Sequence, residues 1–253
     1  MEDEAASVYT DDSEDRLASP AVFAPHVVSF RLGTRTIRAV GAASDDRHPN
    51  VLRVRVCNSI LDRVVQGLFR LASTLVPGVR SAFPEWFLPR NLVLKRKKNG
   101  WDEEFETERE TYQKLRPVQG YIVPTFYSQV EHDGIPAIVL SDVGGACLAE
   151  PAGAVLEPEA LQPLLHLSQS ILADLGILHD DVKLDHFRIA DSRDKVIVVD
   201  FERVVTGLSR EHMRFLMNSS TKRLMEYYKD NLQCLEADGT IRRPLGEHVR
   251  AAE

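Results

Sequence analysis

The order of hydrophobic patterns along the 253 residues predicts an α+β fold. Strand patterns, in which apolar and polar residues alternate, fill most of the first part of the chain, for example at 26–40 and 51–57. Helical patterns dominate the later part, at 159–175 and 209–232. Because runs of strands followed by runs of helices are typical of α+β proteins, we expect a β-rich lobe and a shorter helical lobe, divided at the loop "SDVGGACL" (141–148).

Strands and helices are both expected in the first half. Alternation and β-branched residues predict one or two strands at 26–40, one at 51–57, one at "LVLK" (92–95) and two at 121–140, around a turn at 132–134. Apolar residues recur every three or four positions from 60 to 72, after a cap at Asn58 or Ser59, and again within 101–115, so both segments are expected to be helices. The stretch 76–91 contains too much proline for a helix.

The second half is expected to hold a helix at 159–175, a short buried strand "KVIVVDF" at 195–201, and one or two helices at 209–232. These patterns suggest an N-terminal lobe over 21–140 and a C-terminal lobe over 141–235. Residues 1–20 are predicted to be a disordered acidic tail, and residues 236–253 a loose C-terminal tail.

Charge and composition limit the classes of function. The net charge is −7, and residues 1–16 supply −6 of it, since seven acidic residues face Arg16 alone. The remainder sums to nearly neutral, so no nucleic-acid partner is expected. The run "KRKK" at 95–98 is interpreted as a solvated strand end, with nuclear localisation as the alternative.

Three isolated cysteines and the lack of a long apolar run indicate the compartment. Cys57, Cys147 and Cys234 are odd in number and form no C-x-x-C pair, which suits a reducing compartment and argues against a thiolate zinc site. No run of about 18 apolar residues occurs, and the acidic start does not resemble a secretory signal. We therefore expect a cytoplasmic protein, or a nuclear one, with no membrane partner; its oligomeric state stays open.

The segment "ILHDDVKLDHFRI" (177–189) concentrates possible chemistry, because three aspartates and two histidines fall within eight positions. One interpretation is a His-Asp metal cluster of a metal-dependent phosphohydrolase. The other is the catalytic loop of a phosphotransferase, in which a single carboxylate receives a proton. Phosphoryl transfer requires a lysine for the phosphates, an acid that holds it, an aspartate near the acceptor hydroxyl and metal ligands. Lys95, Glu108, Asp181 and Asp200 occur in that order.

These residues resemble the motifs of the protein-kinase-like superfamily, over about residues 92–205. "LVLK" is similar to the strand that ends in the phosphate-binding lysine, and "FETERETYQKL" to the helix with its glutamate partner. "IVLSDVGG" resembles the hinge, "LHDDVKLDH" the loop H-R-D-L-K-x-x-N, and "VVDFE" the D-F-G motif. The chain also resembles small kinase-like proteins of fungi and the aminoglycoside and choline phosphotransferase branch.

The resemblance implies a bilobal protein-kinase-like fold and a role for each matching residue. Lys95 would bind the α- and β-phosphates of ATP, with Glu108 as its ion-pair partner, and Asp181 would be the catalytic base. The resemblance further implies three sets of contacts: Lys183 with the γ-phosphate, Asp200 and His186 with Mg²⁺, and the hinge residues Leu140, Ser141, Asp142 and Val143 with the adenine. The second substrate would carry a hydroxyl group, on a small molecule or a protein.

Several departures from the family pattern keep a second function open. His186 stands where a metal-binding Asn is expected, and Mg²⁺ prefers oxygen ligands. No G-x-G-x-x-G precedes Lys95, Glu202 replaces the glycine of D-F-G, and only 53 residues follow Asp200. The leading hypothesis is an ATP-dependent phosphotransferase. The alternatives are a pseudokinase that acts as a nucleotide- or protein-binding module, and the His/Asp phosphohydrolase.

Overall fold

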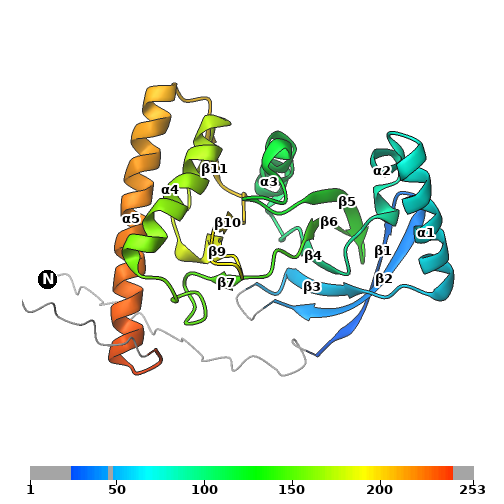
Figure 1. Cartoon of the computed structure of the whole chain (residues 1–253), viewed down its shortest axis with the longest axis horizontal. Coiled ribbons are helices and arrows are strands. Elements are labelled where there is room, and N and C mark those ends of the chain that lie inside the picture. Colours follow the sequence, from blue (N-terminus) through cyan, green and yellow to red (C-terminus); the bar gives the residue numbers. More distant parts are fainter. Residues whose placement is uncertain (1–23, 45–47, 242–253) are drawn as a thin grey trace, which may run out of the picture.

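The computed structural model describes residues 24–44 and 48–241 (Figure 1). The predicted acidic tail at 1–20, and residues 242–253 of the predicted loose tail, lie outside the described residues. The described chain is a mixed α+β protein, as the sequence predicts: a curled antiparallel sheet, two smaller sheets and several helices.

The main sheet has six antiparallel strands in the order β1-β2-β3-β4-β6-β5. Their bounds are β1 His26–Leu32, β2 Arg35–Ala43, β3 Val51–Val56, β4 Asn91–Arg96, β5 Phe126–His132 and β6 Ile135–Ser141. The edge strands β1 and β5 contact each other, so the sheet curls around its own apolar side. Alternate residues such as Phe30, Ile37, Val54 and Leu94 fill this interior, as strand periodicity requires.

The strands β3 and β4 pair directly, with Val51 opposite Lys95, although 34 residues separate Val56 from Asn91. That insertion holds helix α1 (Ile60–Leu75), the short helix α2 (Val79–Ala82) and the 3₁₀ turn η2 (Pro84–Trp86). The proline-rich stretch therefore contains two short helical turns, α2 and η2, that its composition did not predict. Pro84 is the first residue of η2, where its missing N–H is tolerated.

Helix α3 (Asp102–Lys114) follows β4, and the turn η3 (Arg116–Val118) leads on to β5. The sequence suggested Asp102 as the cap, but Asp102 is the first helical residue and Trp101 holds the cap position. Phe105, Glu108 and Tyr112 are buried, because spacings of three and four place them on one side of the helix.

The second half contains two long helices, α4 (Pro158–Asp174) and α5 (Arg210–Ala237), which pack side by side away from the main sheet (Figure 1). A three-stranded sheet, β10-β9-β7, and the strand pair β11-β8 lie between these two helices and the main sheet. Their bounds are β7 Ala146–Cys147, β8 Ile177–His179, β9 Phe187–Ile189, β10 Val196–Val198 and β11 Val204–Thr206, with the 3₁₀ turn η4 at Leu184–His186. α5 is one continuous helix and continues past the expected boundary at 235.

The main core joins α3, α4, α5 and the small sheets through side chains such as Tyr112, Leu165, Phe187, Phe201 and Tyr228, all almost fully buried. The strand expected at 195–201 pairs only over Val196–Val198, and the backbone after it leaves the sheet. That departure positions Asp200. Within the described ranges, no helix has the length and apolar character that crossing a membrane requires.

Candidate functional site

Lys95 lies near the end of β4, between β3 and β6, and its side chain is only 8% exposed. A buried ammonium group requires compensating charge, because leaving water is expensive for an isolated cation. Three carboxylates supply that charge: the Nζ atom lies 2.7 Å from Glu108 Oε2, 2.9 Å from Asp200 Oδ1 and 3.0 Å from Glu202 Oε1. The ion pair that the sequence predicts between Lys95 and Glu108 is present.

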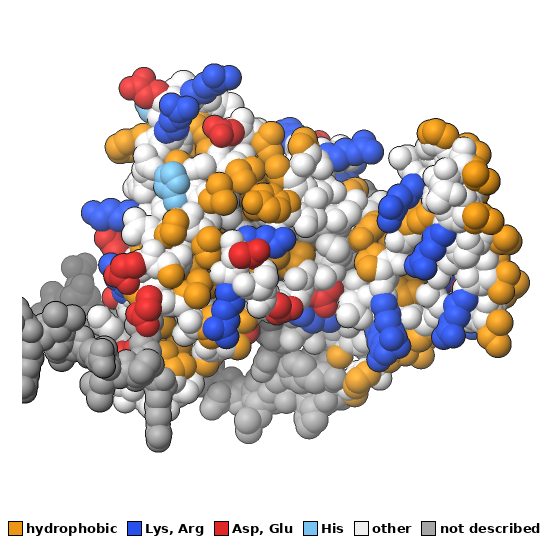
Figure 2. Space-filling view, in the orientation of Figure 1, with side chains coloured by type: hydrophobic (Ala, Val, Ile, Leu, Met, Phe, Trp, Pro, Cys, Tyr) orange, Lys and Arg blue, Asp and Glu red, His pale blue; other side chains and the backbone are white. Residues whose placement is uncertain are grey.

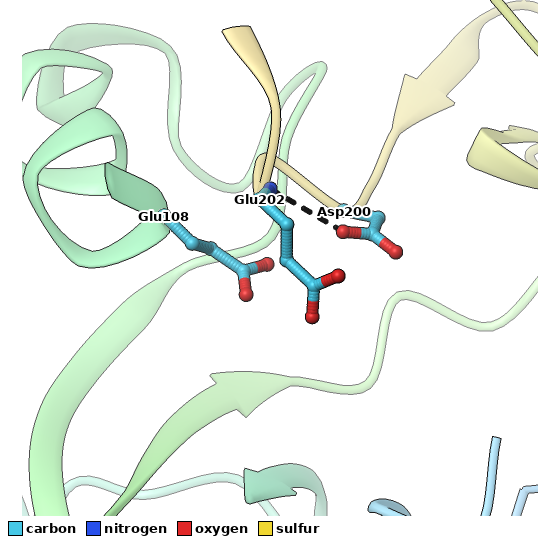
Figure 3. A group of neighbouring side chains, drawn as sticks. All are labelled: Glu108, Asp200 and Glu202. Atoms are coloured by element: carbon cyan, nitrogen blue, oxygen red, sulfur yellow. Dashed lines mark hydrogen bonds between the residues drawn. The ribbon is translucent and has the colours of Figure 1, made fainter. Parts of the chain in front are cut away.

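The three carboxylates come from two parts of the chain and point into one space (Figure 3). Glu108 extends from α3, whereas Asp200 and Glu202 follow β10. The Glu202 N–H donates to Asp200 Oδ1 at 3.4 Å, and Glu202 Oε2 also pairs with Lys98 Nζ at 2.7 Å. This is the single group of at least three potential metal ligands within reach of one another in the described part of the chain, and it is buried or half-buried.

Burial and charge shift the pKa values of this cluster in different directions. Burial raises the pKa of Glu108, with Lys95 opposing this and Asp200 adding to it. Burial alone would lower the pKa of Lys95, but the three carboxylates outweigh burial and raise it. Burial opposes ionisation of Asp200 as well, yet the nearby Lys95 and His186 hold its pKa well below the ordinary range. Lys95 is therefore charged and Asp200 ionised at neutral pH.

The backbone at Asp200 is held in an unusual conformation. Its φ is 64°, in the left-handed region that non-glycine residues rarely adopt. The buried N–H of Phe201 donates to Glu108 Oε1 at 3.3 Å, and the Phe201 ring packs edge-on against Tyr112. His179 Nε2 also hydrogen-bonds the carbonyl oxygen of Asp200. These contacts fix the direction in which the Asp200 carboxylate points.

The segment "HDDVKLDH" divides its residues among different roles. His179 lies in β8 and stacks on His186, with ring centroids 4.6 Å apart, so it supports the loop from within. Lys183 Nζ pairs with Asp181 Oδ2 at 2.8 Å, and this pair is substantially exposed. Burial raises the pKa of Asp181, but the hydrogen bond from Lys183 and the nearby His186 and Lys183 together outweigh burial and lower this pKa, which keeps the carboxylate ionised.

His186 connects the two aspartates. Its Nδ1 lies 2.9 Å from the carbonyl oxygen of Asp181, and its Nε2 lies 3.9 Å from Asp200 Oδ2. A carbonyl oxygen only accepts, so Nδ1 carries a proton, and Nε2 faces the Asp200 carboxylate. Metal-binding histidines usually donate their other N–H to such a group. Asp200 Oδ2 and His186 Nε2 thus fit a divalent cation as a mixed oxygen and nitrogen pair.

A cavity of about 690 Å³ adjoins this cluster. Its walls include all four predicted hinge residues, Leu140, Ser141, Asp142 and Val143, together with Lys95, Glu108, Asp185, His186 and Asp200. Volumes of about 300–1,000 Å³ are typical of small-molecule sites. At the hinge, Gly145 has a φ of +65°, and a Cβ there would lie 2.3 Å from the carbonyl oxygen of Ile189, so only glycine fits this turn.

Sequence reasoning missed four residues of the site. Glu202 was noted only as a departure from a motif, although its spacing of two from Asp200 could have suggested a shared site. Lys98, which pairs with Glu202, was interpreted as solvated. Arg53 lies on the cavity wall and pairs with Asp142 at 3.4 Å, and Arg188 donates to the carbonyl oxygens of Gly144 and Gly145. No sequence signal marked the arginines, since both depend on strand pairing.

The structure also places a loop where the sequence offers no glycine-rich motif. The loop between β2 and β3 reaches the cavity through Ser44 and His48, because β3 pairs directly with β4.

No protein-family model matches the chain, and a comparison with curated proteins finds no match.

Proposed function

We propose that this chain is an ATP-dependent phosphotransferase of protein-kinase-like fold, with the main sheet and α3 as its N-terminal lobe and the α4 and α5 region as its C-terminal lobe. The observation that carries the proposal is the position of Lys95. It is buried against Glu108 and Asp200, on the wall of a cavity whose other walls include Leu140 to Val143 and His186.

The cavity suits a nucleoside triphosphate by size. Leu140 and Val143 offer apolar surface to a base, and Lys95 and Arg53 offer cations to phosphates. Ser44 and His48 of the β2–β3 loop also line the cavity, and the side chains of Lys95 and Arg53 would hold the phosphates. The phosphate oxygens of a bound nucleotide would compete with Asp200 and Glu202 for the ammonium group of Lys95.

In the proposed reaction, the acceptor oxygen attacks the γ-phosphorus, the bond to the oxygen of ADP breaks, and Asp181 receives the hydroxyl proton. The ionised state of Asp181 suits this role, and Lys183 is close enough to Asp181 to neutralise charge near the γ-phosphate. The acceptor class is a hydroxyl compound.

Asp200 and His186 are the residues that would hold Mg²⁺ or a similar cation, with Glu202 as a third ligand if it leaves Lys95. When bound, the cation supplies charge for the phosphate oxygens. The protein's own contribution is orientation: His179, Phe201 and Glu108 fix the segment that carries Asp200.

A binding module without turnover is the second candidate, favoured by a specific observation. Lys95 already has three carboxylate partners, and Glu202 also holds Lys98, so the resting site is internally satisfied. The phosphohydrolase hypothesis receives no such support. In the described residues, the close group of potential metal ligands does not include His179, Asp180 or Asp181, and His179 Nε2 is engaged with a backbone oxygen.

The first prediction concerns nucleotide binding. ATP with Mg²⁺ or Mn²⁺ should raise the melting temperature of the full chain, because a ligand at one hundred times its Kd adds about 2.7 kcal/mol to the free energy of unfolding. Lys95→Met and Asp200→Ala should abolish this shift, and Lys97→Met, two positions further along the chain, should retain it. The absence of any shift with the wild-type chain would refute both nucleotide-dependent candidates.

Turnover distinguishes the two candidates. With γ-labelled ATP and a panel of hydroxyl acceptors, the wild-type chain should transfer the label, and Asp181→Asn should bind ATP but transfer at least a hundredfold more slowly. Binding without any transfer or ATP hydrolysis would favour the module over the enzyme.

A further inference from the structure

Helix α1 lies at the edge of the molecule (Figure 1). The side of α1 that carries Asp62 and Gln66 faces the rest of the protein. The Asp62 carboxylate pairs with the buried Arg35 at 3.2 Å, and Gln66 accepts from the side-chain amide of Asn58. Phe69 stacks on Trp86, with ring centroids 5.4 Å apart. Residues 62, 66 and 69 follow helical spacing, so this side of α1 is fixed.

The opposite side of α1 is apolar and exposed. Six aliphatic side chains, each between 55% and 82% exposed, form what we call the α1 apolar face: Ile60, Leu61, Val64, Leu68, Leu71 and Leu75. Spacings of three and four place them in one stripe, which covers the outer edge of the molecule in Figure 2. Amphipathic helices normally turn this side to the core, and a contiguous exposed patch marks an interaction surface.

Basic residues border this face. Arg63 and Arg70, seven positions apart, lie on the same side of α1, next to the stripe. On the main sheet, Arg31, Arg38 and Arg55 alternate with buried residues, so all three point outward from the curled side. Figure 2 shows Lys and Arg side chains in rows beside the apolar edge.

No acidic residue occurs in β1, β2 or β3, and residues 24–98 contain fourteen Lys and Arg against four Asp and Glu. The net charge after the acidic tail is therefore near zero only because residues 24–98 are strongly basic and the residues after them are acidic. A charge summed over the sequence says nothing about the arrangement of charge in space, so the near-neutral sum does not exclude a basic face on the folded chain.

We propose that the α1 apolar face docks on an anionic lipid surface, with the bordering arginines at the level of the headgroups. The combination of an apolar stripe on a surface helix and arginines beside it is that of helices which lie in the plane of a membrane interface. Long arginine side chains can lay their stems along apolar surface while the guanidinium groups contact phosphates.

Charge favours this occupant over a second copy of the chain. Two copies joined through α1 would bring two strongly basic surfaces together, and like charges would oppose the contact. The charged residues nearest the stripe on α1 are Arg63 and Arg70, which have the same sign, so α1 offers no pair of opposite charges that would specify the register of a partner helix. A lipid surface requires no register.

A helix that lies on a membrane differs from one that spans it. The sequence-based expectation of no membrane partner considered only spanning and secretory segments, and α1 is a 16-residue amphipathic helix that such a search does not detect. The proposal does not depend on nucleotide binding, since α1 contributes no residue to the cavity.

The test is flotation of the full chain with vesicles. The chain should float with phosphatidylcholine vesicles that contain about 30% phosphatidylserine and should bind phosphatidylcholine alone at least tenfold more weakly. Leu68→Glu with Leu71→Glu should abolish flotation. Arg63→Gln with Arg70→Gln should weaken it by about fivefold for each charge removed, and added salt should weaken it further.

Phe215→Glu is the matched control, because Phe215 is 69% exposed on the distant helix α5, and this variant should float like the wild-type chain. All these sites are exposed, so unchanged melting temperatures and an unchanged ATP response will show that the fold and the cavity are intact. Absence of flotation, equal binding to neutral vesicles, or equal loss with Phe215→Glu would each overturn the proposal. A dimer that the Leu68 and Leu71 substitutions separate, without flotation, would assign the face to a second copy.

Discussion

His186 adds a ring nitrogen to a site whose other potential metal ligands are carboxylate oxygens. Its ring lies between the backbone of Asp181 and the carboxylate of Asp200, and His179 stacks on it. An imidazole nitrogen next to a carboxylate oxygen suits Mn²⁺ and other transition metals better than Mg²⁺, which prefers oxygen ligands alone. In the proposed cation site, His186 would therefore favour Mn²⁺ over Mg²⁺.

The metal preference gives a prediction for His186. We expect the wild-type chain to show a larger ATP-dependent thermal shift with Mn²⁺ than with Mg²⁺. His186→Asn should reverse this order, because the amide oxygen is a ligand that Mg²⁺ accepts. Thermal shift and electron paramagnetic resonance of bound Mn²⁺ both report binding without turnover. His166→Asn, a change of the same kind on α4, is the control, and an unchanged cation order in His186→Asn would contradict the assignment.

Among the elements, α1 depends most on local interactions. Its N-terminus is a capping box: the Asp62 N–H donates to Ser59 Oγ at 3.1 Å, and the Ser59 N–H donates to Asp62 Oδ2 at 2.8 Å. Few of its residues are buried, so α1 gains little from the core. Capping and the contacts of Asp62 and Phe69 therefore determine how often the helix opens.

Loss of the cap should loosen α1 alone. Ser59→Ala should remove about 1 kcal/mol from the local stability of the helix, which makes hydrogen exchange of α1 amides about fivefold faster. The global melting temperature should change little, because the core does not include α1. Ser73→Ala, in the last turn of the same helix, is the control and should leave exchange in the first turns as it is. Equal acceleration in both variants would argue against the role of the capping box.

At the scale of the whole molecule, the Lys95 cluster joins three segments that are distant in sequence: β4, α3 and the chain after β10. Glu108, Asp200 and Glu202 remain close together only while a cation lies among them, since buried like charges repel one another. The cluster consequently links the main sheet to the part of the molecule that contains α4 and α5.

Removal of Lys95 should destabilise the protein in a pH-dependent way. Lys95→Met leaves buried carboxylates without their cation, which should lower the free energy of unfolding by about 3–5 kcal/mol near neutral pH. Their pKa values then rise above the unfolded values, so the loss should be largest at high pH and should shrink as the carboxylates take up protons between about pH 8 and pH 5.

Urea denaturation at several pH values measures this dependence. Wild-type Asp200 has a lowered pKa. Its contribution to the free energy of unfolding is therefore present above the ordinary pKa of an aspartate and is lost only as the pH falls below that value. Lys97→Met removes a more exposed pair with Asp102 and should change the stability by less than about 1 kcal/mol at every pH. A loss in Lys95→Met that does not vary with pH would contradict the electrostatic role of the cluster.

The sequence predicted the α+β class and most of the long elements, because alternating or helical periodicity over many residues is a strong local signal. It failed at short elements. The turn at α2 and the length of β10 depend on contacts with other segments, and a run of three or four residues contains too few positions to show a period. The sequence also placed Lys95, Glu108 and Asp200 in one hypothesis through their spacing and motif order.

Local patterns in the sequence therefore establish the α+β class, the long helices and strands, and the candidate residues of the site. Packing between distant segments establishes that Glu202 completes the Lys95 cluster, that His186 lies between two aspartates, and that the apolar side of α1 faces outward. Periodicity records which residues share a face of an element. The direction in which that face points follows from packing between segments distant in the chain, and no local pattern contains that information.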